Sequence, residues 1–505
     1  MKLHKANKDL SYYIEFNAKN NPHKIFISTD SYKINFLELR QKIISIHYFL
    51  KKKGIKKKDR IVGYFSNSIE QIIAMLAVTT YGAIWIPLSS DREISYFNFI
   101  LKETKPKLIL IEEIFYKFFK KNNLKNTIIV KKKLINFEQN HCLKILPKNN
   151  LYKTCCIIFT SGTSGPPKGV MVSQRMLLLS AIGNAISSKY TKKDRYLLWE
   201  SLHHIAGIQL FVMGLIYPTK IYLISKFSRK SFWIIVKKFK ITILHYLGGL
   251  LEILLKNKKS KAEQSHSIKI AYGAGCRPLI YRAFKKRFKI PIREVYGMTE
   301  ASSFSTINKI NTQGIIGKPV PWLNIELLDK NKKIITKPLC IGEIAIKEKV
   351  KGALFNGYYG KKRINKNNFF LSGDLAKYNS KFELIYAGRA KDTIRVKGIN
   401  ISAWEIEGIV NSHKFVSESA ALAIPALVGE DDILVIISRK KNFRKSLFSY
   451  ANYYRTKFSK LSFPRYWAFI DQFPRTPTQR IDKKLIEIKK LQVMDYYKKK
   501  LLKLS

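Results

Sequence analysis

The sequence predicts an α/β protein with a large N-terminal domain of stacked αβ layers and a smaller C-terminal domain. Short apolar runs alternate with amphipathic stretches, which predicts a strand at residues 60–64, a helix at 69–81 and a strand at 83–87. At 505 residues the chain is too long for one ordinary domain. A boundary near Gly388 divides it into residues 1–388 and residues 389–505, and the second part has the size of a small independent domain.

The composition indicates a globular protein of the cytoplasm. Hydrophobic residues make up 46% of the chain and aromatic residues 12%, which excludes a disordered chain. The start, MKLHKANKDL, lacks the apolar core of a signal peptide, so we expect none. The apolar stretches 72–88 and 205–218 contain Gly or Pro and are shorter than the ~20 residues of a membrane span, so we expect no span. The odd set of five cysteines has no CxxC pair, which favours a reducing cytosol.

The net charge of +58 raises the alternative of a nucleic-acid-binding protein. The basic residues are spread along the whole chain in short lysine runs, such as 51–53, 56–58 and 131–133. Lys, Ile, Asn, Tyr and Phe are enriched together, and AT-rich codons encode all of them. No focused basic stripe or nucleic-acid motif accompanies the charge, so we expect no specific nucleic-acid partner.

A loop of hydroxyl residues and glycines follows the strand predicted at residues 155–159. Glycines allow the backbone to turn and present N–H groups to an anion, hydroxyls add donors, and a lysine adds a positive charge. The order is not that of a Walker loop, because the lysine stands between proline and glycine. The pattern predicts a polyphosphate site, and its candidate residues are Thr160, Ser161, Gly162, Thr163, Ser164, Gly165 and Lys168.

This loop resembles, almost residue for residue, the phosphate-binding signature of the adenylate-forming (AMP-binding) superfamily. Acyl-CoA synthetases, aryl-CoA ligases, peptide-synthetase adenylation domains and luciferases belong to it. The resemblance covers about residues 10–490, and further family signatures follow in order. YGAGCRP at 272–278 is similar to the segment bordering adenine, which implies contacts from Gly273, Ala274 and Gly275. In YGMTE at 296–300, the resemblance implies that Tyr296 and Gly297 meet adenine, Thr299 the α-phosphate and Glu300 Mg²⁺.

The C-terminal signatures imply a ribose site and a hinge. Asp374, in Leu-Ser-Gly-Asp, is similar to the family carboxylate that accepts hydrogen bonds from both ribose hydroxyls. The resemblance also implies that Arg389 reaches the ribose and that Lys391 is the pivot of a mobile α+β domain. The segment that would then meet the thiol substrate contains Arg395, Lys397 and Gly398.

The acid pocket implied by the resemblance contains His204, Gly207, Tyr246, Gly248 and Met298. His204 could instead be an ordinary core or rim histidine; the adjacent His203 is the weaker candidate. No Cys, His or Asp lies at zinc-ligand spacing from them. Because the pocket segments carry no Arg or Lys, we expect a monocarboxylic acid. Glu200 could favour a cationic group, although a solvated rim position is more usual for glutamate.

Arg480 departs from the family pattern. The chain reads Thr-Pro-Thr-Gln-Arg at 476–480, where the family usually has Gly-Lys, and arginine is bulkier and planar. Some ligases of the carnitine/crotonobetaine type resemble this form, and the segments 199–207 and 245–249 look like the same branch. We therefore interpret Arg480 as functional. The alternatives are an inactive adenylation half-reaction, or a role for Lys483 or Lys484.

Together these features predict an ATP-dependent, AMP-forming acid–thiol ligase. It would use ATP and Mg²⁺ to convert a small carboxylic acid to an acyl-adenylate and then transfer the acyl group to CoA. Its predicted catalytic residues are Lys168, Thr299, Glu300 and Arg480. A freestanding enzyme that loads a carrier protein is the alternative within the same class.

Overall fold

The structure is a computed structural model of the 505-residue chain. It describes residues 3–89, 94–115, 127–130, 145–160, 167–247, 249–276, 278–361, 364–365, 367–396, 399–426, 431–440, 446–458, 462–476 and 480–503.

The first sheet contains β7 and β8, the two strands on either side of the predicted phosphate loop. Its strand order is β6-β5-β3-β4-β7-β8, and its pairs are parallel except for the antiparallel hairpin β7–β8. The bounds are β3 Arg60–Phe65, β4 Ile84–Ser89, β5 Leu108–Glu112, β6 Thr127–Val130, β7 Thr154–Thr160 and β8 Lys168–Ser173. Helix α3 (Ile69–Tyr81) begins at Ser68, whose side chain accepts from the Gln71 amide, and it ends at Gly82 in a left-handed conformation with φ +92°.

A second, larger sheet holds most of the remaining strands. Its order is β16-β17-β18-β19-β15-β14-β13-β12-β11-β9-β10-β1-β2. The part from β13 to β1 is parallel, and the strands from β14 to β16 pair antiparallel. The bounds are β1 Ile25–Ser28, β2 Lys33–Asn35, β9 Arg195–Leu198, β10 Lys220–Leu223, β11 Ile243–Leu247, β12 Ile270–Ala274, β13 Ile292–Tyr296, β14 Thr306–Ile307, β15 Ile315–Pro319, β16 Leu323–Leu328, β17 Ile341–Glu348, β18 Phe370–Tyr378 and β19 Leu384–Arg389.

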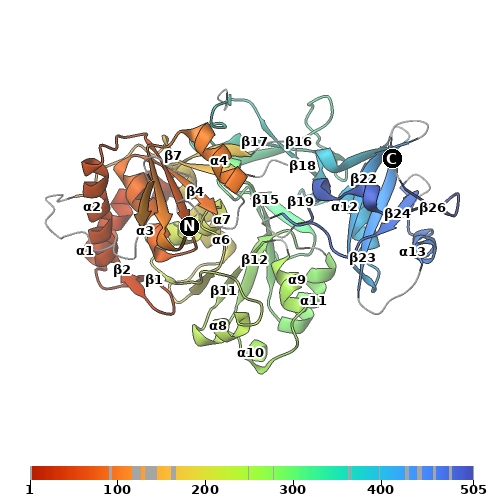
Figure 1. Ribbon diagram of the computed structural model, residues 1–505, viewed down its shortest axis with the longest axis horizontal. Coiled ribbons are helices and arrows are strands. Elements are labelled where there is room, and N and C mark those ends of the chain that lie inside the picture. Colours follow the sequence, from red (N-terminus) through yellow and green to blue (C-terminus); the bar gives the residue numbers. More distant parts are fainter. Residues whose placement is uncertain are drawn as a thin grey trace.

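Helices α6 (Gln174–Ser187) and α7 (Ile205–Ile216) pack against each other at the centre of the protein (Figure 1). Almost every side chain of both helices is buried, and one hydrophobic core joins them to strands of both sheets. A second core lies on the other face of the large sheet. The outer helices are α1 Leu10–Asn20, α2 Phe36–Lys52, α4 Ile94–Thr104, α8 Phe232–Lys238, α9 Leu250–Leu255, α10 Lys261–Gln264 and α11 Pro278–Phe288. Of the catalytic candidates, Lys168 begins β8, whose Val170 and Val172 belong to this core, and Thr299 and Glu300 lie in a 3₁₀ turn shortly after β13.

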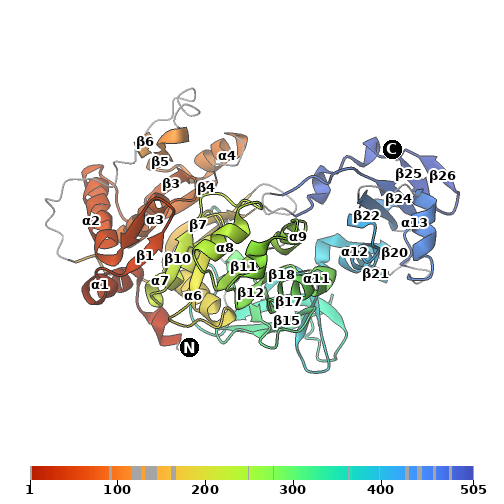
Figure 2. The same ribbon diagram turned by 90° about the horizontal axis from the view of Figure 1, so that it is seen from below.

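Residues after β19 form a separate lobe, at the right of Figures 1 and 2. It contains a two-stranded sheet, β20-β21, a five-stranded sheet, β22-β23-β24-β25-β26, and hydrophobic cores of its own. The bounds are β20 Thr393–Val396, β21 Ile399–Ser402, α12 Ala403–Val410, β22 Val416–Pro425, β23 Asp431–Arg439, α13 Leu447–Tyr454, β24 Tyr466–Phe469, β25 Val493–Asp495 and β26 Lys500–Leu502. The lobe contacts β19 through Ser402, whose hydroxyl donates to the Ala387 carbonyl at 2.6 Å, and through Trp404, whose ring lies 5.4 Å from that of Tyr386.

The local predictions from the sequence agree closely with these elements. The predicted helix has the bounds of α3, and the predicted strand at 60–64 is β3, one residue longer. The strand predicted at 83–87 is β4, displaced to Ile84–Ser89. Among the described helices, none is both long enough and apolar enough to cross a membrane.

We predict that Gly273→Ala destabilises the protein by about 1–3 kcal/mol, because it over-packs the sheet. A Cβ at Gly273 would lie 1.9 Å from the carbonyl oxygen of Tyr246, its register partner on the neighbouring strand β11. Chemical denaturation measures the change. The control is Gly408→Ala in α12, where a Cβ meets nothing within 4 Å and alanine should stabilise the helix. Equal stability of Gly273→Ala and the wild type would contradict the close approach of the two strands.

Candidate nucleotide and acid site

The predicted phosphate loop connects the two strands of the β7–β8 hairpin. Thr160 and Lys168 are register partners at the end of the hairpin, and the Thr160 hydroxyl donates to the Lys168 carbonyl at 3.4 Å. Ser161, Gly162, Thr163, Ser164 and Gly165 lie outside the described residues. Lys168 is exposed, so its ammonium group is available to an anion at this end of the sheet.

Tyr358 connects Lys168 to Glu300. The phenol of Tyr358 donates to Oε1 of Glu300 at 2.9 Å, and the Lys168 ammonium lies 5.1 Å from the centre of the Tyr358 ring. Backbone hydrogen bonds hold this arrangement. The Tyr359 amide donates to the Gly169 carbonyl at 2.7 Å, and the Phe355 amide donates to the Glu300 carbonyl at 2.9 Å. A cation, a phenol and a carboxylate are thus fixed side by side.

Glu300 is a buried carboxylate that suits a magnesium ion held mainly by a nucleotide. It is 7% exposed, and burial raises its pKa against the opposing effects of the Tyr358 hydrogen bond and the Lys168 charge. The described residues contain no group of three potential metal ligands. One carboxylate with substrate phosphates is a usual set of Mg²⁺ ligands, so the residues present fit the ion. Thr299, half-buried, precedes Glu300 in a single 3₁₀ turn, and the next backbone turn places Ser302 at φ +55°.

The side chain of Asp374, on β18, contacts side chains from two other strands, β13 and β19. Its carboxylate accepts hydrogen bonds from the phenols of Tyr296 at 2.8 Å and Tyr386 at 3.3 Å, and it pairs with the Arg389 guanidinium at 3.2 Å. These contacts join β13, β18 and β19 directly before the C-terminal lobe. Burial lowers the pKa of Arg389, but the charge of Asp374, together with smaller effects of Tyr386 and Asp392, raises it overall. The carboxylate remains 7% exposed, which suits a partner such as a ribose hydroxyl.

The glycines predicted to border adenine lie at the carboxyl end of β12. Gly275 has φ +85°, a conformation that glycine adopts without strain. A Cβ at Gly297 would lie 1.7 Å from the Ser303 carbonyl, so only glycine fits there. Glu294, which the motifs did not identify, holds the turn, because its Oε1 accepts from the Cys276 amide at 2.7 Å and from the Tyr246 phenol at 3.2 Å. Ala274 is half-buried at the end of the same strand.

The predicted hinge and the C-terminal motif meet at the start of the small lobe. Lys391 lies exposed in the 3₁₀ turn Ala390–Asp392. Lys397 and Gly398 lie outside the described residues, as does the side chain of Arg395. Arg480 is exposed, and desolvation and the positive charge of Arg389 lower the pKa of its guanidinium.

Lys483, the alternative to Arg480, is engaged elsewhere. Its ammonium pairs with Glu407 at 2.7 Å, lies 3.9 Å from Asp392 and donates to the Ala421 carbonyl at 3.2 Å. These contacts attach the C-terminal motif to the residue that follows the hinge. Lys484 is exposed.

The predicted pocket residues stand around the start of α7 and the ends of β11 and β13. His204 occupies the N-cap of α7, and a Cβ at Gly207 would lie 2.6 Å from the Ser201 carbonyl. Met298 is half-buried beside the main core, whereas Tyr246 is fully buried in the second core. Gly248 lies outside the described residues.

The view of Glu200 as a solvated rim residue is wrong. Glu200 is 3% exposed, and its Oε1 pairs with Nδ1 of His245, which is 5% exposed. The sequence could not reveal this pair, because 45 residues separate its members along the chain.

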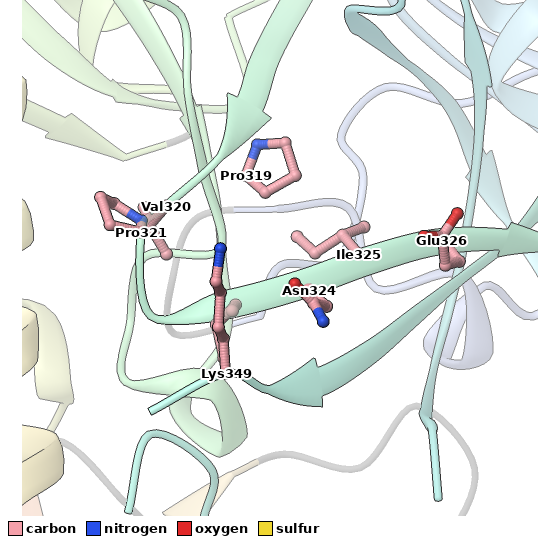
Figure 3. A pocket seen from close by; sticks show the side chains of 8 residues that line it. Pro319, Val320, Pro321, Asn324, Ile325, Glu326 and Lys349 are labelled. Carbon is pink, nitrogen blue, oxygen red and sulfur yellow. The ribbon is translucent and has the colours of Figure 1, made fainter. Parts of the chain in front are cut away.

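A separate shallow hollow of about 320 Å³ lies between β15, β16 and the segment after β17 (Figure 3). In Figure 3 its lining side chains include Pro319, Pro321, Asn324, Glu326 and Lys349. It contains none of the predicted site residues.

The hairpin β7–β8, the buried Glu300 and the carboxylate of Asp374 thus lie within one α/β domain, where the sequence predicted a nucleotide site. The chain belongs to the AMP-binding enzyme family, which it matches over residues 14–359. The predictions of this family, of its α/β fold and of an enzyme are thereby confirmed.

Relatives with known functions match along nearly the whole chain. A 2-succinylbenzoate–CoA ligase of Bacillus cereus is 22% identical over 468 residues, which cover 91% of this chain and 94% of the ligase. Tyrocidine synthase 1 of Brevibacillus parabrevis is 24% identical, and the match covers 95% of this chain and 45% of the synthase.

Solved structures of similar proteins share the fold. The o-succinylbenzoate CoA synthetase of Bacillus subtilis, in complex with its acyl-adenylate intermediate, superposes with a TM-score of 0.83 at 21% identity and covers 94% of this chain and 97% of its own. ATP-bound MatB from Rhodopseudomonas palustris gives a TM-score of 0.86 at 20% identity and covers 95% and 98%. The Bacillus synthetase has also been solved with ATP and a magnesium ion. The prediction of ATP, Mg²⁺ and CoA agrees with these relatives.

We predict that Glu294→Gln changes the pH dependence of stability. Burial raises the pKa of Glu294 to about 7. The folded state therefore holds a proton between pH ~4.5 and ~7 that the unfolded state releases, so this group lowers the free energy of unfolding as pH rises through that window. Relative to the wild type, Glu294→Gln should gain about 2–4 kcal/mol between pH 5 and pH 8.

Urea unfolding at both pH values measures the effect, with Glu103→Gln as the control because Glu103 is exposed. A constant difference between Glu294→Gln and the wild type across this range would show that Glu294 is not buried as described.

Proposed function

We propose that this protein is an ATP-dependent acid–thiol ligase that forms an acyl-adenylate and transfers the acyl group to CoA, with release of AMP and pyrophosphate. The observation that carries the proposal is the joint placement of Lys168, Tyr358 and Glu300 on one side and of Asp374 and Arg389 on the other. A polyphosphate, its counter-ion and a ribose need these groups at neighbouring strand ends. The CoA ligases among the relatives support the same reaction.

In the first half-reaction, a carboxylate oxygen of the acid attacks the α-phosphorus of ATP, and the bond to pyrophosphate breaks. Lys168 and Thr299 neutralise and orient the phosphate oxygens, and Arg480 binds the incoming carboxylate. Glu300, oriented by the phenol of Tyr358, would hold Mg²⁺, which would supply charge neutralisation for the phosphates. Catalysis of this kind consists mainly of positioning and electrostatic stabilisation.

In the second half-reaction, a thiolate attacks the acyl carbonyl and AMP leaves. We propose that residues 389–505 act as one mobile domain that pivots at Lys391 and carries Arg395, Lys397 and Gly398 toward the thiol. The ion pairs of Lys483 with Glu407 and Asp392 support such a rigid unit, since they attach the C-terminal motif to the hinge. A carrier protein remains the alternative thiol donor. Comparing acyl-CoA formation with loading of a holo-carrier protein separates the two.

We place the enzyme in the cytoplasm, because its described cysteines are free thiols. The finer resemblance to carnitine/crotonobetaine-type ligases stays a prediction. Nucleic-acid binding, the alternative of another class, predicts a steep salt dependence of DNA affinity.

Arg480→Ala tests both halves of the proposal. Loss of a charged partner from a desolvated contact typically costs about 2–5 kcal/mol, or roughly 30-fold to several-thousand-fold in rate. Acid-dependent exchange of labelled pyrophosphate into ATP should therefore nearly disappear in Arg480→Ala. The variant should still convert supplied acyl-adenylate and CoA to acyl-CoA. Arg480→Lys should retain much of the exchange.

The matched control is Lys489→Ala, which removes an exposed charge nine residues away. Normal exchange by Arg480→Ala would reduce Arg480 to a surface charge. No exchange by the wild type with any acid would overturn the proposed adenylation.

A further inference from the structure

The β-hairpin of β25 and β26 lies at the far end of the small lobe from the large domain (Figures 1 and 2). The proposed ligase chemistry uses none of its residues. The two strands pair antiparallel, and residues 496–499 form the turn between them. Oδ1 of Asp495 accepts hydrogen bonds from the amides of Tyr497 at 3.0 Å and of Lys498 at 3.3 Å, and Lys499 takes a left-handed conformation with φ +52°. The turn therefore has a defined structure.

Exposed lysines give this hairpin a positive charge; they are Lys498, Lys499, Lys500 and Lys503. In the part of the chain that the structure describes, no carboxylate forms an ion pair with any of them. Asp495, the one acid between residues 491 and 503, is 1% exposed and pairs with Arg465 at 3.0 Å. Asp432 pairs with the same guanidinium at 3.0 Å. These lysines are therefore open to an anionic partner.

Two large apolar side chains lie beside the lysines. Tyr497 is 59% exposed and Leu501 is 56% exposed. Leu501 is the register partner of Met494, which shares a hydrophobic core with α13, so both side chains lie on the sheet face that this helix covers. Single exposed apolar residues are common on protein surfaces, but two of them within a run of lysines form a surface that is both apolar and cationic.

Aromatic contacts hold the turn of the hairpin against α13. The ring of Phe448 on this helix stacks on that of Tyr496, with centroids 5.4 Å apart, and the Lys499 ammonium lies 5.7 Å from the centre of the Phe448 ring. The Tyr496 phenol donates to Oδ1 of Asn452, also on α13, at 3.1 Å. The lysines and the exposed apolar side chains are thus presented from a fixed base.

The chemistry of this surface favours a lipid surface over a second copy of the chain or a nucleic acid. β26 is the edge strand of its sheet, and lysines on an edge strand oppose pairing with another chain. A nucleic acid offers phosphates to the lysines, but an exposed leucine gains nothing from a phosphate backbone. At an anionic lipid surface, lysines meet the headgroup charges, a tyrosine ring lies at headgroup level, and leucine enters the acyl boundary.

We propose that residues 496–501 dock this protein peripherally on an anionic lipid surface. The lysines bind headgroup phosphates, and Tyr497 and Leu501 enter the interface between headgroups and acyl chains. Charge complementarity carries the inference, since the lysines are not neutralised by the described carboxylates and the apolar side chains beside them are exposed. The proposed nucleotide contacts lie on β18 and β19, at the other end of the lobe, so docking does not depend on the ligase reaction (Figures 1 and 2).

Flotation of the full-length protein with lipid vesicles tests the proposal. One preparation is phosphatidylcholine alone, and the other contains about 30% phosphatidylglycerol as the anionic lipid. At ~0.1 M salt the wild type should float with the anionic vesicles only, and ~0.5 M salt should release most of it. The triple variant Lys498→Gln/Lys499→Gln/Lys500→Gln should lose more than about 30-fold in affinity, because each lysine near an anionic surface contributes about 5-fold. Arginine at the same three positions should retain the binding.

The matched control is Lys56→Gln/Lys57→Gln/Lys58→Gln, which removes the same charge from another exposed run of lysines. That run has no exposed apolar neighbour, since Ile55 before it is 6% exposed and Asp59 follows it. The control should change the affinity for anionic vesicles by less than about 3-fold. Equal losses in the two triple variants would show that net charge alone attracts the protein, and would overturn the proposal.

Single variants separate a lipid surface from other polyanions. Tyr497→Ser and Leu501→Ser keep the charge, and each should lower the affinity for anionic vesicles by about 5-fold while leaving the affinity for a DNA duplex unchanged. Tyr497→Trp should retain vesicle binding, because both rings suit the headgroup region. Circular dichroism confirms that each variant is folded. Failure of the wild type to float, or full vesicle affinity in both serine variants, would overturn the proposal, and loss of DNA affinity in the lysine variant alone would then identify a nucleic-acid surface.

Discussion

The carboxylate of Asp374 is the contact on which the geometry of the site depends. It accepts from two phenols, Tyr296 and Tyr386, and pairs with the guanidinium of Arg389. Those partners belong to the strand before the Glu300 turn and to the last strand before the small lobe. A ribose bound to Asp374 would therefore contact a carboxylate whose position depends on both of these strands. Because Asp374 is almost fully buried, loss of one of these partners would leave its charge less well compensated.

The phosphate side of the site is organised by hydrogen bonds of the backbone. Residues 355–359 bond to β8 and to Glu300, so the phenol of Tyr358 is held between a lysine and a carboxylate. Burial of Glu300 raises its pKa, and its own backbone amide, the Tyr358 hydrogen bond and the Lys168 charge oppose that shift. A polyphosphate with its magnesium ion would supply the charges that this arrangement requires.

Much of the fold could be predicted from the sequence, and the motifs of the proposed nucleotide site could be recognised there, because the informative features are local. The helix Ile69–Tyr81 has a serine cap, an apolar body and a terminal glycine, and these fix its bounds within one short segment. The glycines, hydroxyl residues and lysine of the predicted phosphate loop are likewise neighbours in the sequence, at residues 160–168, so this pattern can be recognised from a short segment.

Other features depend on contacts across the chain. Tyr358 and Tyr386 look like ordinary aromatic residues until folding places their phenols on Glu300 and Asp374. Glu200 resembled a solvated glutamate because its partner, His245, stands two strands away in sequence. Lys483 and Arg480 are three positions apart with the same charge, and the contacts of Lys483 with Glu407, Asp392 and Ala421 distinguish them. No short pattern encodes such pairings.

The central claim is that a carboxylate oxygen attacks the α-phosphorus of ATP at this site. The most direct measurement uses an acid that supports pyrophosphate exchange, labelled with ¹⁸O in both carboxylate oxygens, with ATP and CoA. Mass spectrometry of the products should find one ¹⁸O in AMP and none in pyrophosphate. AMP without the label, or label in inorganic phosphate, would contradict the account.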